Sequence, residues 1–84
     1  MTMPTPILLP DLGAGDETVR VSCWLVDPGE IVVAGDRVVE VFIKGITFDV
    51  AAPVSGILSR IEKSLDTRIV PGDILGWIEP DNGD

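Results

Sequence analysis

The chain contains an internal repeat, and this repeat restricts the fold more than any other feature of the sequence. The segment 34–41, AGDRVVEV, lines up with the segment 71–78, PGDILGWI, and apolar residues upstream of the two segments match as well. In a chain of 84 residues, neither half could bury its apolar face alone. The repeat therefore predicts two small sheets that pack on each other around an approximate twofold axis.

The alternation of apolar and polar residues, interrupted at Gly, Pro and Asp, predicts short strands and no helix. Nine glycines and seven prolines spread along the chain agree with many strands joined by tight turns. We expect an all-β fold, a flattened barrel or sandwich of two small antiparallel sheets. The expected strands are Ile7–Leu9, Val19–Val26, Ile31–Val32, Arg37–Ile43, Ile46–Ala51, Gly56–Ile61, Arg68–Ile69 and Ile74–Glu79.

The length suffices for one small domain with one core. Prolines at positions 4 and 6 and the final segment PDNGD predict flexible ends at 1–6 and 80–84 around a domain at 7–79. The N-terminus has no basic segment followed by an apolar run, and no stretch approaches the roughly 18 apolar residues of a membrane span. We therefore expect a soluble cytoplasmic protein that does not enter membranes.

Charge and composition exclude several classes of function. Fourteen acidic and six basic residues give a net charge of −8, which disfavours nucleic acid and anionic lipid as partners. There is no histidine, and the single cysteine, Cys23, can neither form an internal disulfide nor hold a metal alone. Most aspartates lie in expected turns, where they cap the backbone. We therefore expect no metal site and no autonomous enzyme activity.

The segment 38–53, VVEVFIKGITFDVAAP, predicts a β-hairpin with Lys44 and Gly45 at its tip. Gly45 is expected to have a positive φ, because glycine reaches that region without steric cost. Phe42, Ile43 and Ile46 flank the tip and form a candidate contact surface for a partner or for a weak homodimer, unless the sheet curls enough to bury them.

The motifs ILLPDLG, WLVDPGE, AGDRVVEV, FDVAAPVSG and PGDILGWIE, in this order from Ile7 to Glu79, resemble the lipoyl and biotinyl attachment domains. The similarity is greatest to the lipoyl domains of 2-oxo acid dehydrogenase dihydrolipoyl acyltransferases. This resemblance implies a quasi-symmetric flattened barrel and a carrier without catalysis of its own. It further implies a covalently attached lipoyl group, in preference to biotin, on a hairpin-tip lysine. The implied partners are 2-oxo acid dehydrogenase components and a lipoate ligase.

The register of the hairpin tip differs from the usual lipoyl pattern, in which the tip reads Asp-Lys-Ala. The family's lysine stands nine residues after the aspartate of the Gly-Asp turn and eight before the proline of the Ala-Pro step. Counting from Asp36 and counting back from Pro53 both lead to Gly45, so Gly45 occupies the attachment slot. Lys44, one residue earlier, is the candidate attachment residue.

Two functions are consistent with this tip. In the first, the chain is a lipoyl-type carrier modified at Lys44. In the second, it is an unmodified lipoyl-like module that uses Phe42, Ile43 and Ile46 to bind a partner or itself. Because a fixed attachment position at Gly45 would prevent lipoylation, this glycine is the feature that separates the two interpretations.

Overall fold

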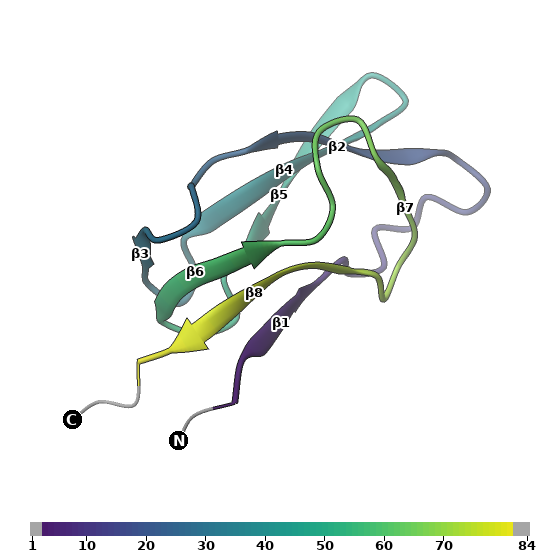
Figure 1. Cartoon of the computed structure of the whole chain (residues 1–84). Helices are drawn as coiled ribbons and strands as arrows, with labels where there is room; N and C mark the ends of the chain where they lie inside the picture. The colour runs from purple at the N-terminus through teal and green to yellow at the C-terminus, as the bar shows by residue number, and fades with distance from the viewer. Residues whose placement is uncertain (1–2, 82–84) are drawn as a thin grey trace.

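The computed structural model describes residues 3–81, and all regular secondary structure in this range is β-strand. The strands form two four-stranded antiparallel sheets, sheet A with the order β1-β8-β6-β3 and sheet B with the order β5-β4-β2-β7 (Figure 1). The predicted all-β fold of two small antiparallel sheets is confirmed. The strands are β1 Thr5–Leu8, β2 Val19–Trp24, β3 Ile31–Val32, β4 Arg37–Ile43, β5 Ile46–Ala51, β6 Gly56–Ile61, β7 Arg68–Ile69 and β8 Ile74–Pro80.

The two sheets are related by the internal repeat of the sequence. In the order in which they lie, strands β1, β8, β6 and β3 of sheet A correspond to strands β5, β4, β2 and β7 of sheet B. A β-bulge recurs at the same position of the repeat, at 21–23 in β2 and at 58–60 in β6. The predicted quasi-twofold arrangement is therefore present in both topology and register.

The Gly-Asp turns of the repeat make equivalent hydrogen bonds in the two halves. The amide of Gly35 donates to the carbonyl oxygen of Ala52 at 2.9 Å, and the amide of Gly72 donates to that of Leu9 at 2.8 Å. In each case the acceptor belongs to the segment beside an edge strand, β5 or β1. Each turn thus fixes the end of one edge strand against its own sheet.

The core lies between the sheets and is entirely apolar. Alternating strand residues direct β-branched and leucine side chains inward, and no polar or charged side chain is buried among the described residues. Burial of this apolar surface, at roughly 25 cal/mol per Å², is the main term that stabilises the fold. The largest fully buried side chains are Ile7, Leu9, Val21, Val32, Val38, Val39, Val41, Leu58, Ile69, Leu75 and Ile78.

Both tryptophans are half-buried, and each indole N–H has an acceptor. Nε1 of Trp24 donates to the carbonyl oxygen of Lys63 at 2.8 Å, and Nε1 of Trp77 donates to Oε2 of Glu62 at 2.9 Å. Both acceptors lie in the connection that leaves β6. The half-buried indole of Trp24 therefore extends the core, and the hydrogen bonds of both indoles hold this connection in place.

Strands β3 to β7 begin and end at the predicted residues, and the other strands differ by one or two residues. Sheet A extends further than the expected domain 7–79, because Thr5 and Pro6 pair with β8 and the amide of Asp81 donates to the carbonyl oxygen of Ser55. The ends at 1–2 and 82–84, which were expected to be flexible, lie outside the described residues. Within 3–81 there is no helix of the length and apolar character that a membrane crossing requires.

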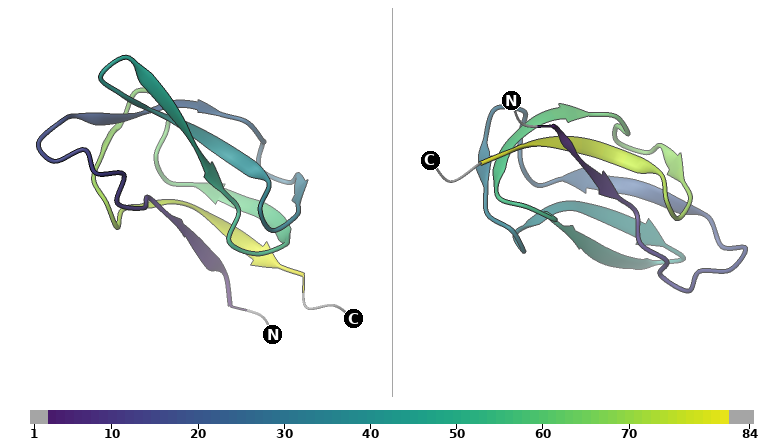
Figure 2. Two further views of the ribbon diagram at one scale, coloured as in Figure 1. Left: turned by 180° about the vertical axis from the view of Figure 1, so that it is seen from behind. Right: turned by 90° about the horizontal axis from the view of Figure 1, so that it is seen from below.

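The molecule is elongated, with extents of 43 × 19 × 19 Å. The start of β1 and the end of β8 lie side by side at one end of the barrel, and the β4–β5 hairpin projects from the opposite end (Figure 1). Figure 2 shows the same arrangement from behind and from below, with the β1–β2 connection beside the hairpin. The hairpin tip therefore lies at the opposite end of the molecule from the start of β1 and the end of β8.

Candidate functional site

The predicted hairpin is present, and its tip is a two-residue turn. Ile43 and Ile46 form the last pair of the β4–β5 ladder, so Lys44 and Gly45 are the two central residues of the turn. Their φ angles are 45° and 83°, and positive values at both positions define a type I′ turn. The twist of such a turn matches the right-handed twist of the flanking strands. The predicted positive φ of Gly45 is confirmed, and the positive φ of Lys44 is an additional feature.

The amine of Lys44 is accessible at the tip of the hairpin. The side chain is 76% exposed, and its Nζ lies 3.7 Å from Oε2 of Glu17, which is itself 50% exposed. An ion pair in such an exposed position contributes little to stability, typically less than about 1 kcal/mol, because water and salt screen it. Glu17 therefore orients the amine without removing it from solvent.

Glu17 reaches the tip through the β1–β2 connection. This connection contains two tight turns, in which the amide of Gly13 donates to Oδ1 of Asp11 and the amide of Glu17 donates to the carbonyl oxygen of Ala14. The turns bring the loop alongside the hairpin (Figure 2). Sequence reasoning did not identify Glu17, because its position depends on the path of a loop that has no periodic pattern.

The expected apolar cluster at the tip is only partly exposed. Phe42 and Ile46 are 42% and 59% exposed, but Ile43 is only 8% exposed and belongs to the core. The reason is the alternation of the strand: Ile43 points to the same face of β4 as the buried Val41, whereas Phe42 points to the outer face. The expectation that Ile43 forms part of an exposed contact surface is therefore corrected.

The exposed apolar side chains near the tip lie on two different faces of sheet B. Phe42 lies opposite Thr47 on the outer face, whereas Ile46 lies opposite Ile43 on the inward face. Phe48, two residues after Ile46, shares its face and is 39% exposed. β5 is an edge strand, so Ile46 and Phe48 have a neighbouring strand of sheet B on one side only.

At the base of the hairpin, contacts between residues of the two strands and of the adjoining segments hold the strands together. Nη1 of Arg37 in β4 lies 3.1 Å from Oδ2 of Asp49 in β5, and the amide of Ala52 after β5 donates to the carbonyl oxygen of Asp36 before β4. These contacts join the Gly-Asp turn to the Ala-Pro step. The tip is therefore carried on a defined two-stranded arm and not on a free loop.

The other candidate groups for chemistry lie away from the hairpin tip. Among residues 3–81 there is no group of three or more His, Cys, Asp and Glu side chains placed to hold a metal ion. Cys23 is a free, exposed thiol in β2, where Sγ donates to the carbonyl oxygen of Trp24. Lys63, the second lysine of the chain, lies in the connection after β6 and is half-buried.

Comparisons with known proteins agree with this geometry. The model of the biotin and lipoyl attachment family, described as "Biotin-requiring enzyme", matches residues 5–78. Two curated relatives, from Escherichia coli K12 and O157:H7, are dihydrolipoyllysine-residue succinyltransferase components of the 2-oxoglutarate dehydrogenase complex. Each is 30% identical over 76 residues, which are 90% of this chain but 19% of the relative. The chain thus spans only a small part of the length of these relatives.

A solved structure shows the same fold. The solution structure of the lipoyl domain of the 2-oxoglutarate dehydrogenase complex from Azotobacter vinelandii matches with a TM-score of 0.69. The match covers 90% of this chain and 98% of that one, at 23% sequence identity. Lipoyl-type domains are carrier modules and are not themselves catalytic. Since the family model covers nearly the whole domain, the chain belongs to the biotin and lipoyl attachment family.

Proposed function

We propose that this chain is a carrier module that presents a covalently attached lipoyl group on Lys44 to partner enzymes. The observation that carries the proposal is the position of this lysine, which is exposed at the tip of a two-stranded hairpin at the far end of a lipoyl-type barrel. A carrier needs an amine that a ligase and several active sites can all reach in the same geometry. A biotinyl group is the second choice of cargo at the same residue.

The proposed partners are enzymes of the 2-oxo acid dehydrogenase kind and a lipoate ligase. The support is the similarity to acyltransferase components whose names place them in the 2-oxoglutarate dehydrogenase complex. Because lipoyl-type carriers have no catalysis of their own, the chemistry would take place in the partners' active sites. A cytoplasmic setting is part of the same proposal.

In the modification step, the residues of this chain supply a nucleophile and its position. The ligase converts lipoate and ATP into lipoyl-AMP and pyrophosphate. The unprotonated amine of Lys44 then attacks the acyl carbon, and an amide forms as the nitrogen loses a proton and AMP leaves. The turn keeps the amine at the exposed tip, 3.7 Å from Oε2 of Glu17. Loss of the ammonium charge on amide formation would release Glu17 from this contact.

The test is the intact mass of the purified protein after incubation with a lipoate ligase, lipoate and ATP. Wild type and a Lys63→Arg control should gain the mass of one lipoyl group, and Lys44→Arg should gain none. A parallel incubation with a biotin ligase and biotin separates the two cargoes. Full-length wild type that gains no mass under conditions that modify an established lipoyl domain would overturn the carrier proposal.

A second candidate function is an unmodified interaction module, and one specific observation favours it. The support is the count of residues from Asp36 and back from Pro53, which leads in both directions to Gly45 as the counterpart of the lysine in the usual lipoyl pattern. In this alternative the exposed apolar side chains of Phe42 and Ile46 bind a partner or a second copy in a weak homodimer.

Sedimentation of the wild type against a Phe42→Ser, Ile46→Ser variant tests the interaction module. A concentration-dependent increase in mass that disappears in the variant would support self-association through the tip. Ile43 is omitted from the variant because its side chain is buried and its replacement would perturb the core. A wild type that stays monomeric up to millimolar concentration would contradict self-association.

A further inference from the structure

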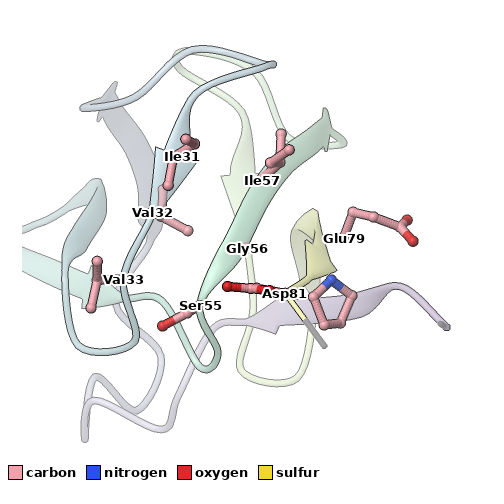
Figure 3. A pocket seen from close by; sticks show the side chains of 9 residues that line it. Ile31, Val32, Val33, Ser55, Gly56, Ile57, Glu79 and Asp81 are labelled. Carbon is pink, nitrogen blue, oxygen red and sulfur yellow. The ribbon is translucent and has the colours of Figure 1, made fainter. Parts of the chain in front are cut away.

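A groove crosses the outer face of sheet A at the end of the molecule that carries the chain ends. It has a volume of about 400 Å³ and is formed by β3, β6 and the end of β8 (Figure 3). The side chains that line its floor and walls are Ile31, Val33, Ser55, Ile57, Glu79 and Asp81. This groove lies far from the hairpin tip and has no part in the proposed attachment of a lipoyl group.

The floor of the groove is an exposed apolar surface. Ile31 is 81% exposed, Val33 is 58% exposed and Ile57 is 44% exposed. Ile31 lies directly opposite Ile57 in the β3–β6 pair, so their side chains are cross-strand neighbours on one face of the sheet. Figure 3 shows these two side chains next to each other on their strands. Such a contiguous apolar surface is typical of a binding site.

The internal repeat supplies a control for this observation within the same chain. In sheet B, the positions equivalent to Ile31 and Ile57 are Arg68 and Arg20, which are likewise opposite each other in the β2–β7 pair. Both arginines are exposed. The barrel therefore folds with charged side chains at these positions, and the isoleucines of sheet A are not required by the fold.

The charge of the groove indicates the chemistry of its occupant. Glu79 lies opposite Ile57 in the β6–β8 pair, Asp81 lines the same side, and no Lys or Arg is among the lining residues. The whole chain carries a net charge of −8, which attracts a basic partner at long range. An apolar floor beside carboxylates is complementary to apolar side chains that alternate with basic ones.

We propose that this groove docks an extended segment of a partner protein in which apolar residues alternate with Lys or Arg. On the β3 side the groove is lined by Ile31 and by Val33 just after the strand, and on the β6 side by Ile57 and by Ser55 just before the strand, so the lining residues of each side are two positions apart. This spacing of about 6.8 Å equals that of successive same-face side chains in an extended segment. Docking at this end leaves Lys44 accessible, so a partner could hold the domain while its tip reacts.

The experiment is a titration of the ¹⁵N-labelled full chain with the synthetic peptide acetyl-Lys-Val-Lys-Val-Lys-Val-Lys-amide. We expect changes in amide chemical shift that concentrate at residues 31–33, 55–57 and 79–81. A peptide with Ser in place of Val has the same charge and tests the apolar part of the recognition. A peptide with Glu in place of Lys tests the charge.

Two variants separate the groove from the rest of the surface. Ile31→Ser, Ile57→Ser should weaken binding of the Val-Lys peptide by about tenfold or more, because it removes the apolar floor. Leu65→Ser, Val70→Ser makes the same kind of change at exposed positions outside the groove and should bind as the wild type does. Preserved spectral dispersion shows that each variant is folded.

Three results would overturn the proposal. The first is a set of shifts that spreads over the acidic surface, or equal binding of the Ser peptide, since either means non-specific attraction. The second is no shift at millimolar peptide. The third is a concentration-dependent shift of the groove residues without peptide, which would assign the groove to a second copy of the chain. None of these readouts depends on whether Lys44 is modified.

Discussion

Asp66 occupies in the second half of the chain the position that Gly29 occupies in the first half, and both have a positive φ, 69° and 96° respectively. Their amides make equivalent bonds: that of Gly29 donates to the carbonyl oxygen of Leu58, and that of Asp66 donates to the carbonyl oxygen of Val21. The internal symmetry therefore extends to the conformation of single turn residues. Aspartate is one of the few non-glycine residues that enter this region at low cost.

This conformation predicts that Asp66→Val lowers the free energy of unfolding by about 1–2 kcal/mol, since a β-branched side chain is strongly disfavoured at positive φ. Asp66→Gly should stay within about 0.5 kcal/mol of the wild type, because the gain in the folded state is offset by a more flexible unfolded chain. Urea denaturation measures both changes, with Leu65→Val at the exposed neighbouring position as the control. Equal midpoints for Asp66→Val and the control would show that the turn does not need a positive φ.

The two residues of the hairpin turn should respond to substitution with opposite signs. Gly45→Ala should lower the free energy of unfolding by about 1 kcal/mol because of its φ of 83°, although no atom lies within 4 Å of the added Cβ. Lys44→Asn should raise it by a few tenths of a kcal/mol, because Asn-Gly is the preferred sequence of a type I′ turn. Chemical denaturation of the two single variants provides the comparison. A stabilising Gly45→Ala would mean that another turn type forms in solution.

Ile43 and Phe42 are neighbours in β4, and their replacement should have different effects. Ile43→Thr places a hydroxyl in the core and should cost about 2 kcal/mol of stability, whereas Phe42→Ser on the outer face should cost less than about 1 kcal/mol. Thermal or urea unfolding measures the difference. A larger loss for Phe42→Ser would place the aromatic ring, and not Ile43, in the core.

The register of the tip can be tested by moving the amine by one residue. Lys44→Asp, Gly45→Lys recreates the Asp-Lys of the usual lipoyl pattern and shifts the attachment point by about 3.8 Å along the chain. If a ligase requires the lysine at the family's position, this variant should be lipoylated faster than the wild type, despite a loss of about 1 kcal/mol from Lys at positive φ. Intact mass at fixed times of reaction with one ligase gives both rates. A faster wild type would contradict the register argument.

The sequence was sufficient to predict the strands but not the environment of the tip. Gly, Pro and Asp residues mark the turns so clearly that β3 to β7 were predicted to the residue. β2 ends two residues earlier than predicted, because apolar character continues through Leu25 and Val26 after the ladder has ended. The local sequence pattern predicts which residues can form a strand, whereas the length of the partner strand decides where the hydrogen-bonded pairing ends.

Burial and proximity at the tip depend on pairing register, which the sequence does not contain explicitly. Alternation alone allowed Ile43 either to close the core or to face solvent, and its place opposite Ile46 on the inward face decided this. Neither the contact of Glu17 with Lys44 nor the groove at Ile31 and Ile57 has a local signature, because each joins segments far apart in the chain. Contacts between segments far apart in the chain can be identified only from the three-dimensional structure.

The internal symmetry also shows which position in the barrel corresponds to the tip of the β4–β5 hairpin. The twofold relation that exchanges β4 with β8 and β5 with β1 superimposes the Lys44–Gly45 turn on the place where the chain begins and ends. A molecule cut between these two residues and closed between its present termini would retain every strand pairing. In such a permuted chain, a new turn would lie at the opposite pole and Lys44 would become a terminus. The two poles of the barrel are equivalent in strand topology, and the place where the chain is continuous decides which of them carries the hairpin.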